Sequence, residues 1–302
     1  MKKLFITFFM LIALVTIFII IKNSKSANKK IQDDNVVLAN EQSIVNENEE
    51  KKITEITIYD IEEGYMNVAY NENAEKHSYN WDKYLNTNNT YYNYNDENYT
   101  TKVGIDVSEF QGDIDWKKVK NSGVEFVILK LGYRGYGESG KLVIDSNFEK
   151  YYEQAINQGI DVGVYFFSQA INIDEVREEA DLVLKNIEGK TITYPVVFDS
   201  EKIKYDTART DNLTMDEITE MMLEFCKIIK ENGYTPSIYG NAKTFTTKTK
   251  LELFNEYNKW YADYQAHPLY PYEFDMWQYT ETGSVDGIEG NADIDICFIK
   301  KR

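Results

Sequence analysis

Cysteine, histidine and proline are scarce in this 302-residue sequence, which contains two Cys, two His and four Pro. Cys226 and Cys297 lie far apart and belong to no CxxC or Cys/His cluster, so we predict two small buried side chains and no metal site. With His77 and His267 alone, a Ser/His/Asp triad is excluded in practice, and we place both histidines on the surface or in loops. No cofactor is expected either.

Positive charge is also in deficit. The chain has 33 Lys and Arg against 50 Asp and Glu, a net charge of -17 and a pI near 4.7. Such a surface repels nucleic-acid phosphates and anionic membrane surfaces, so we exclude nucleic acid as a partner. The hydrophobic content of 43% is enough for one large domain with a full core.

Long hydrophobic runs are absent except at the N-terminus. Residues 4–21 form an uncharged apolar run of 18 residues, the length of a minimal transmembrane helix. A secretory signal has a shorter apolar region, and "NSKSAN" is a mediocre cleavage site, so residues 1–26 favour an uncleaved anchor over a cleaved signal segment. Lysines on both sides of the run leave its orientation open.

Residues 27–101 are rich in Asn, Glu and Tyr and have little hydrophobic periodicity, which predicts a spacer. Within it, "EITIYDI" at 55–61 alternates well enough for a short strand or a hairpin arm. The many tyrosines could instead pack on the domain that follows, so we expect a semi-ordered segment.

From residue 102 the sequence alternates short apolar strands with amphipathic helices, which is typical of parallel βαβ units. We expect helices at about 146–159, 174–188 and 214–232, the last opening with a capping box of Thr214 and Glu217. We expect strands at 103–108, 124–132, 161–168, 194–201, 235–240, 259–264, 275–280 and 292–298. This pattern predicts a small α/β barrel over 102–302 whose last strands lack full helices. An open doubly wound sheet is the alternative, weakened because no glycine-rich phosphate loop follows the first strand.

Carboxylates recur at the ends of the predicted strands, where a parallel barrel has its active site. These acids are Asp106, Asp199, Glu201, Asp263, Asp293 and Asp295.

The stretch "YPVVFDSEKI" places Asp199 and Glu201 two residues apart at the end of an apolar strand. Residues i and i+2 of a strand point the same way, with Cα atoms about 6.6 Å apart, so both acids can face the barrel axis. One pKa should then rise, which would make that group a general acid near neutral pH, as glycosidic bond cleavage requires. Alternatively, these acids cap a helix or pair with Lys202 and Lys204.

Aromatic side chains on the same strand ends could stack on sugar rings, although each one alone fits an ordinary core. As substrate-binding residues we predict Tyr133, Tyr165, Tyr239, Trp260, Asp263, Trp277 and Gln278.

Five motifs, "GIDVSEFQGDIDW", "GVYFFSQA", "YPVVFDSE", "KWYADY" and "WQYTETGSVDGIEGNADID", resemble in this order those of glycoside hydrolase family 25, the lysozymes or N-acetylmuramidases. The resemblance covers about residues 102–300. It implies an irregular TIM-like (β/α)5(β)3 barrel that hydrolyses the β-1,4 bond between N-acetylmuramic acid and N-acetylglucosamine. By motif, Glu201 corresponds to the general acid/base, Asp199 to the second acid of the pair, and Asp106 and Asp293 to the other two active-site acids.

Two departures from the family pattern affect the predicted site. The family often has Asn where Asp295 stands, so the choice between Asp293 and Asp295 stays open. Many members carry a glutamate soon after the second strand, where this chain reads "KLGYRGYGESG".

Sequence spacing cannot distinguish retaining from inverting hydrolysis, because the two differ in carboxylate separation. Substrate assistance by the 2-acetamido group of the sugar is favoured. The alternatives are an inactive peptidoglycan-binding module and a hydrolase of another amino-sugar polymer such as chitin. A peptidoglycan substrate implies a single-pass membrane protein with an extracellular barrel, or a secreted one if the N-terminal segment is cleaved. Partners in any cell-wall machinery are not identified by the sequence.

Overall fold

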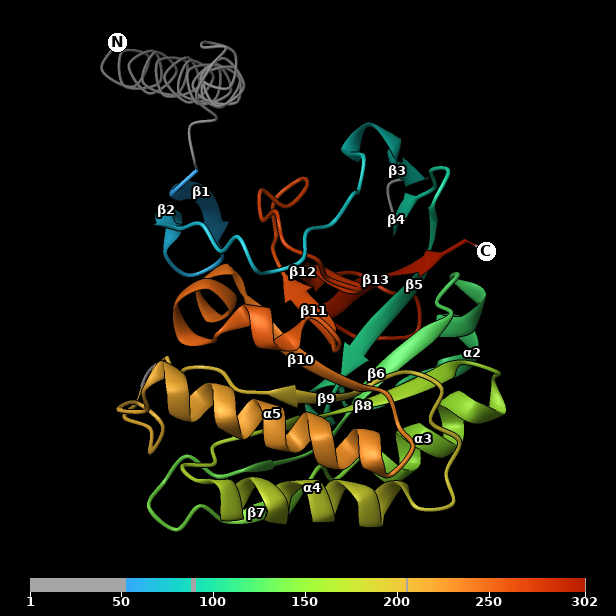
Figure 1. Cartoon of the computed structure of the whole chain (residues 1–302). Coiled ribbons are helices and arrows are strands. Elements are labelled where there is room, and N and C mark those ends of the chain that lie inside the picture. Colours follow the sequence, from blue (N-terminus) through green and yellow to red (C-terminus); the bar gives the residue numbers. More distant parts are fainter. Residues whose placement is uncertain (1–52, 88–90, 205, 302) are drawn as a thin grey trace, which may run out of the picture. The chain divides into compact units, whose positions relative to one another are not determined.

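The computed structural model describes residues 53–87, 91–204 and 206–301 (Figure 1). Thr54–Arg302 form one compact unit. Every helix in the described ranges is too short or too polar to cross a membrane. The predicted anchor at 4–21 lies outside the described residues.

A closed eight-stranded barrel forms the centre of this unit, as the sequence predicts. Around the barrel the strand order is β5, β6, β8, β9, β10, β11, β12 and β13, and β13 pairs back onto β5. Their bounds are β5 Tyr99–Val107, β6 Phe126–Arg134, β8 Asp161–Phe167, β9 Val196–Asp199, β10 Pro236–Asn241, β11 Asn258–Ala262, β12 Met276–Gly283 and β13 Ala292–Lys300. The short β7, Leu142–Ile144, extends the sheet beyond β6.

All neighbouring barrel strands are parallel except where β13 pairs with β12 and β5. The carboxyl ends of the parallel strands therefore meet at one end of the barrel. The antiparallel β13 enters from that end, and its register sets Asp293 opposite Asp106. Strand direction and register thus bring together acids from the first and the last strand of the barrel.

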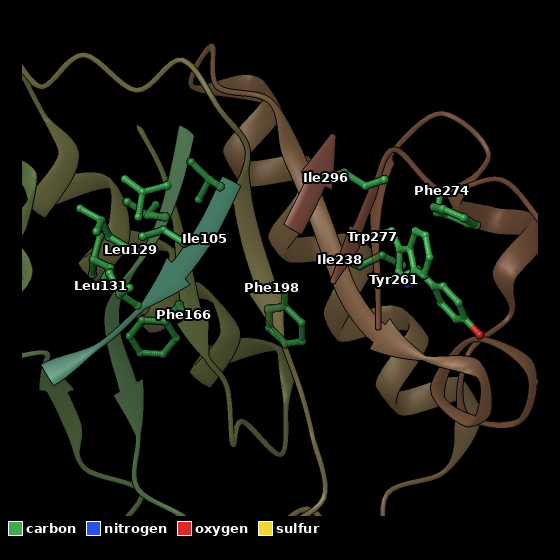
Figure 2. Packing of buried hydrophobic residues seen from close by; sticks show 14 of the residues in the cluster. Ile105, Leu129, Leu131, Phe166, Phe198, Ile238, Tyr261, Phe274, Trp277 and Ile296 are labelled. Carbon is green, nitrogen blue, oxygen red and sulfur yellow. The ribbon is translucent and has the colours of Figure 1, made fainter. Parts of the chain in front are cut away.

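Alternation along the strands divides the core into two parts. Inward-facing side chains fill the barrel with an inner cluster of Phe126, Ile128, Tyr194, Val197, Tyr239, Trp260, Ala262 and Met276. The larger cluster lies between the sheet and its cover and includes Ile105, Leu129, Phe166, Phe198, Tyr261 and Trp277 (Figure 2).

Helices cover the strands of the first half of the barrel (Figure 1). The amphipathic helices α3 Phe148–Asn157, α4 Ile173–Ile187 and α5 Met215–Glu231 contact β6, β8, β9 and β10 and agree with the predicted ones. The predicted capping box of Thr214 and Glu217 opens α5. Several short helical elements of the barrel were not predicted, namely the 3-10 helix η2 Glu109–Gln111, α2 Trp116–Asn121, the π-helix η3 Thr244–Lys248 and the 3-10 helix η4 Leu251–Phe254.

Two hairpins lie in the predicted spacer. The first joins β1 Glu55–Asp60, the strand expected at 55–61, to β2 Gly64–Ala69. The second joins β3 Tyr84–Thr87 to β4 Tyr91–Tyr94 and follows the 3-10 helix η1 Trp81–Lys83. Between residues 54 and 101 the chain is therefore part of the folded unit, and the tyrosines pack on the domain, as the second reading of this segment expected.

The second hairpin and the residues before it pack on β12 and β13. Tyr79 is the centre of this aromatic cover: its ring stacks on Phe298 at 3.9 Å, and its hydroxyl donates to the Phe274 carbonyl at 2.5 Å. Trp81 and Tyr92 contact Trp277. Since an unsheltered sheet face would expose these core side chains to water, the aromatic cover shelters this part of the sheet.

Tyr79→Ala is expected to lower the free energy of unfolding by roughly 2–4 kcal/mol, because it removes a large ring from this packing. The measurement is urea unfolding of the full chain. Tyr65→Ala is the matched control, because Tyr65 is 58% exposed on β2, and should cost less than about 1 kcal/mol. Equal losses in the two variants would contradict a structural role for the aromatic cover.

Candidate active site

A cavity of about 600 Å³ opens at the carboxyl ends of the parallel strands. Acids and aromatic rings dominate its lining, which consists of Ile61, Asp106, Tyr136, Tyr165, Phe167, Asp199, Glu201, Lys202, Ile203, Lys204, Asp206, Tyr239, Trp260, Tyr264, Gln278, Glu281 and Asp293. This composition suits a polar ligand with apolar ring faces, such as a sugar.

Asp199 is the last residue of β9, and Glu201 lies just beyond the strand. Both side chains line the cavity, which agrees with the same-side orientation that their spacing predicts. Asp199 is 4% exposed, and its Oδ1 has no hydrogen-bond partner among the described residues. This oxygen is therefore a buried acceptor without a partner in the described residues, on a side chain that borders the cavity.

A second group of acids lies across the barrel mouth. Gln278 on β12 donates from Nε2 to Asp106 Oδ2 at 2.7 Å. Its Oε1 accepts from the hydroxyls of Tyr239, at 2.9 Å, and Tyr264, at 3.0 Å. Gln278 thus orients Asp106 and ties it to two aromatic walls.

Asp293 and Asp295 lie at different depths. Asp293 borders the cavity, whereas Asp295 is fully buried and accepts from Trp260 Nε1 at 2.8 Å. Of the two acids that the sequence left open, Asp293 is therefore the one that faces a ligand.

The family model described as Glycosyl hydrolases family 25 matches residues 105–288, which is more than half of the chain. The chain belongs to this family. The match includes Asp106, Asp199 and Glu201, and it ends before β13, so Asp293 lies outside it.

Relatives of known name agree with this membership. The chain is 28% identical over 196 residues to the autolytic lysozyme of Clostridium acetobutylicum, an alignment that covers 64% of this chain but only 54% of that protein. Among solved structures, the lysozyme of Streptomyces coelicolor is 25% identical with a TM-score of 0.54, over 64% of this chain and 90% of that one. The modular autolysin LytC of Streptococcus pneumoniae, solved with a synthetic peptidoglycan ligand, is 25% identical with a TM-score of 0.57, over 66% of this chain and 47% of that one.

Desolvation raises the pKa of both Asp199 and Glu201. The pKa of Asp199 lies well above its ordinary value because the carboxyl is desolvated and lies near Glu201. Glu201 is exposed to solvent but lines the cavity, and desolvation there, followed by the nearby charge of Glu62, raises its pKa to about 7. Lys130 and Lys204 partly oppose these shifts. The pair therefore retains a proton near neutral pH.

The second group shows the same effect. Burial, followed by mutual repulsion, raises the pKa of Asp106 and of Asp295 well above the ordinary value. Burial and then the Glu281 charge raise the pKa of Asp293 to about 6. The packing of the barrel therefore raises the pKa of every acid in this second group above its ordinary value.

Four of the seven predicted substrate-binding residues line the cavity, namely Tyr165, Tyr239, Trp260 and Gln278. The other three do not. Trp277 follows the inward-facing Met276 and therefore points outward, where it packs under the aromatic cover. Asp263 is fully buried and accepts from Tyr261 and from the Gln265 amide.

Tyr133 takes a different position because β6 is irregular between Lys130 and Gly132. Its ring lies 5.3 Å from the Lys130 ammonium and away from the cavity. The rings of Phe110, Tyr165 and Phe167 lie within 5.9 Å of the same ammonium. Tyr133 therefore belongs to the surroundings of Lys130 and is not part of the cavity lining.

Several lining residues gave no signal in the sequence: Ile61, Tyr136, Phe167, Lys202, Ile203, Lys204, Asp206, Tyr264 and Glu281. Most of them lie in loops, where no periodicity reveals which way a side chain points. The two histidines lie outside the cavity: His77 stacks on Tyr79 and His267 on Trp81. Cys226 is buried as predicted, whereas Cys297 is only partly buried. No group of residues in the described ranges is suited to a metal ion.

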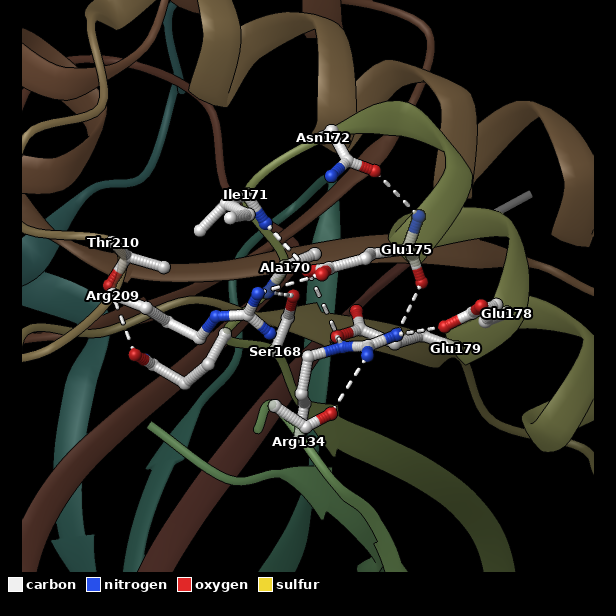
Figure 3. A network of polar contacts seen from close by, with 12 residues as sticks. Arg134, Ser168, Ala170, Ile171, Asn172, Glu175, Glu178, Glu179, Arg209 and Thr210 are labelled. Atoms are coloured by element: carbon white, nitrogen blue, oxygen red, sulfur yellow. Dashed lines mark hydrogen bonds and ion pairs between the residues drawn. The ribbon is translucent and has the colours of Figure 1, made fainter. Parts of the chain in front are cut away.

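A polar network lies next to the loop that carries Glu201 and bonds to it; Figure 3 shows the part of this network around Arg134, Glu175 and Arg209. Gln169, fully buried, donates to the Glu201 carbonyl at 3.2 Å and accepts from the Thr210 hydroxyl at 3.0 Å. Arg209, the residue before Thr210, pairs with Glu175 of α4 at 2.7 Å. The loop therefore starts and ends on rigid elements.

Arg134 secures the α4 end of this network (Figure 3). Its guanidinium is 4% exposed and donates to Glu179 at 2.7 Å, to Glu178 at 3.0 Å and to the Glu175 carbonyl at 2.8 Å. Because it bonds both side chains and backbone of α4, Arg134 holds the helix against β6.

Asp295→Asn is expected to raise the free energy of unfolding by roughly 1–3 kcal/mol at pH 7. In the folded chain this carboxyl keeps its proton to a higher pH than in the unfolded chain, so it reduces stability as pH rises above its ordinary pKa. The gain should shrink toward pH 4. Thermal or urea unfolding at both pH values measures it.

Asp181→Asn is the matched control, because Asp181 is exposed on α4. It should change stability by less than about 0.5 kcal/mol at either pH. A loss of stability at pH 7 in Asp295→Asn would contradict the assignment of a destabilising buried acid.

Proposed function

We propose that this protein is a peptidoglycan hydrolase of the muramidase type, which cleaves the β-1,4 bond between N-acetylmuramic acid and N-acetylglucosamine. The observation that carries the proposal is the position of Asp199 and Glu201 on one side of a cavity lined by acids and aromatic rings. Membership of family 25 and the similarity to proteins named lysozyme support it. The chain spans only 54% of the length of the autolytic lysozyme that it matches. The activity of the whole protein is therefore part of what we propose.

The aromatic walls fit a glycan. Tyr165, Tyr239 and Trp260 present rings to the cavity, and ring faces stack on the C–H faces of sugars. The Tyr239 hydroxyl and the Trp260 indole N–H are used within the protein, since Tyr239 donates to Gln278 and Trp260 to Asp295. These internal bonds fix the rings before a sugar binds, which reduces the entropy lost on binding.

Substrate-assisted hydrolysis suits the acid pair. In this mechanism the 2-acetamido oxygen of the sugar attacks the anomeric carbon, while Glu201 protonates the leaving oxygen. Asp199, which lines the cavity beside Glu201, orients the acetamido group by accepting its N–H. Glu201, now ionised, then removes a proton from the water that opens the cyclic intermediate, so the starting protonation state is restored.

Two other functions compete with this one. A binding module would keep the cavity but release no new reducing ends from peptidoglycan. A hydrolase of another amino-sugar polymer, such as chitin, would produce fragments without muramic acid. Mass analysis of the digestion products separates the three, because a muramidase leaves muramic acid at the reducing end.

The location of the substrate would place the barrel outside the cytoplasm. Under this proposal residues 4–21 anchor the chain with its start inside the cell, or are removed as a signal. Fractionation of cells with high salt tests the anchor: an anchored protein stays with the membrane, and a secreted one is found in the medium.

Glu201→Gln is expected to lower kcat on purified peptidoglycan by roughly 10²–10⁴-fold, the usual contribution of a general acid. The assay counts new reducing ends. Glu153→Gln on α3, an exposed residue far along the chain from the cavity lining, is the matched control and should retain wild-type activity. An active Glu201→Gln variant would contradict the role of Glu201, and an inactive wild type would contradict the enzyme proposal.

The pH profile offers an independent test. Glu201 must be protonated to act as the acid, so kcat/KM should fall as pH rises through an apparent pKa of about 7. An ordinary glutamic acid would already lose activity above about pH 4.5. A profile that declines from pH 4.5 onward would therefore show that the protein does not raise the pKa of this group.

A further inference from the structure

The β1–β2 hairpin reaches the mouth of the barrel although it lies far outside the family match, which begins at residue 105. Its turn, residues 61–63, contributes Ile61 to the cavity lining. A segment that sequence composition assigns to a spacer thus borders the candidate active site.

A buried acid fixes the turn. Asp60 is 1% exposed, and its Oδ1 accepts from the amides of Glu62, at 2.9 Å, and Glu63, at 3.0 Å. Its Oδ2 accepts from the amide of Lys243, just after β10, at 2.8 Å. Lys243 also pairs with Glu63. Because one carboxylate bonds both the turn and the barrel, the position of the hairpin tip is determined by the fold.

Ile61 and Glu62 occupy the tip. Ile61 is half-buried and packs against the inner cluster of the barrel. Glu62 pairs with Lys204 at 3.5 Å, and Lys204 belongs to the loop that follows Glu201 and also lines the cavity. An ion pair at this exposure is weak, but it shows that hairpin and loop meet at the cavity rim.

We propose that the β1–β2 hairpin is a specificity element of the glycan groove, in which Ile61 forms a wall against a bound sugar and Glu62 supplies a negative charge beside Glu201. The proposal rests on the function proposed above. It goes beyond that function because the wall comes from a part of the chain that precedes the family 25 domain.

The charge of Glu62 acts among several others around Glu201 and, after the larger effect of desolvation, raises the pKa of that group. The groups that face Glu201 from the packed elements are Lys130 of β6, Tyr165 of β8, Asp199 of β9, Lys204 of the following loop, Tyr239 of β10, Tyr264 after β11 and Asp293 of β13. The two lysines in this set favour the ionised Glu201 carboxylate. Asp199 and Asp293, together with Glu62 of the hairpin, favour its protonated form.

The wall is tested by changing the size of residue 61. A peptidoglycan tetrasaccharide is titrated by calorimetry into the full chain carrying Glu201→Gln, so that binding is measured without cleavage. Ile61→Trp should weaken binding at least tenfold by filling the groove, and Ile61→Ala should change it by about two- to fivefold. Tyr65→Trp, on the exposed face of the same hairpin, should bind as the parent does.

The charge is tested by Glu62→Gln, with Glu63→Gln as the matched control because Glu63 lies next to it in the same turn. Removing the Glu62 charge should lower the pKa of the Glu201 carboxyl, measured by carbon NMR titration. It should also reduce kcat/KM at pH 7 by roughly two- to fivefold while leaving the rate at pH 5 nearly unchanged. Glu63→Gln should alter neither quantity.

The outcomes are distinguishable. Wild-type tetrasaccharide affinity in both Ile61 variants, with unchanged melting temperatures, would overturn the wall. An unchanged Glu201 titration in Glu62→Gln would overturn the charge, and this measurement needs no activity. A parent chain that binds no tetrasaccharide at all would overturn the proposed function together with the glycan wall.

Discussion

The pairing of β13 with β5 is the constraint on which the rest of the molecule depends. It closes the barrel, and because β13 runs against its neighbours it sets Asp293 directly opposite Asp106. Closure also requires Gly104 on β5, since a Cβ there would lie 2.2 Å from the Phe126 ring that fills the interior. The same hydrogen-bond register therefore determines both the packing of the barrel and the meeting of its acids.

Desolvation of these acids links stability to the proposed chemistry. Each buried carboxyl prefers its proton in the folded chain, so the group reduces stability at neutral pH in comparison with an amide. The same preference keeps a proton on the Asp199 and Glu201 pair near pH 7, where a general acid is needed. Burial of these carboxyls therefore lowers the stability of the barrel at the positions where a protonated carboxyl would serve the proposed reaction.

The segment before the barrel performs two tasks that the family 25 match does not cover. Its aromatic cover shelters β12 and β13 through the stacking of Tyr79 on Phe298 and through Trp81 on Trp277. Its first hairpin, fixed by Asp60, extends to the cavity. A segment that lacks helical periodicity can serve in this way because tyrosine buries a large ring while its hydroxyl bonds to backbone, as Tyr79 does with Phe274.

The sequence by itself determined the barrel strands, the three main helices and the acids at the strand ends, because the alternation of two residues along a strand and 3.6 along a helix is local. It placed Asp199 and Glu201 on one side for the same reason. Only the tertiary structure decided that Asp293 rather than Asp295 borders the cavity, that Trp277 points outward, and that Ile61 reaches the site. Those results depend on register and on contacts between residues far apart in the chain, such as Asp60 with Lys243, which no local pattern encodes.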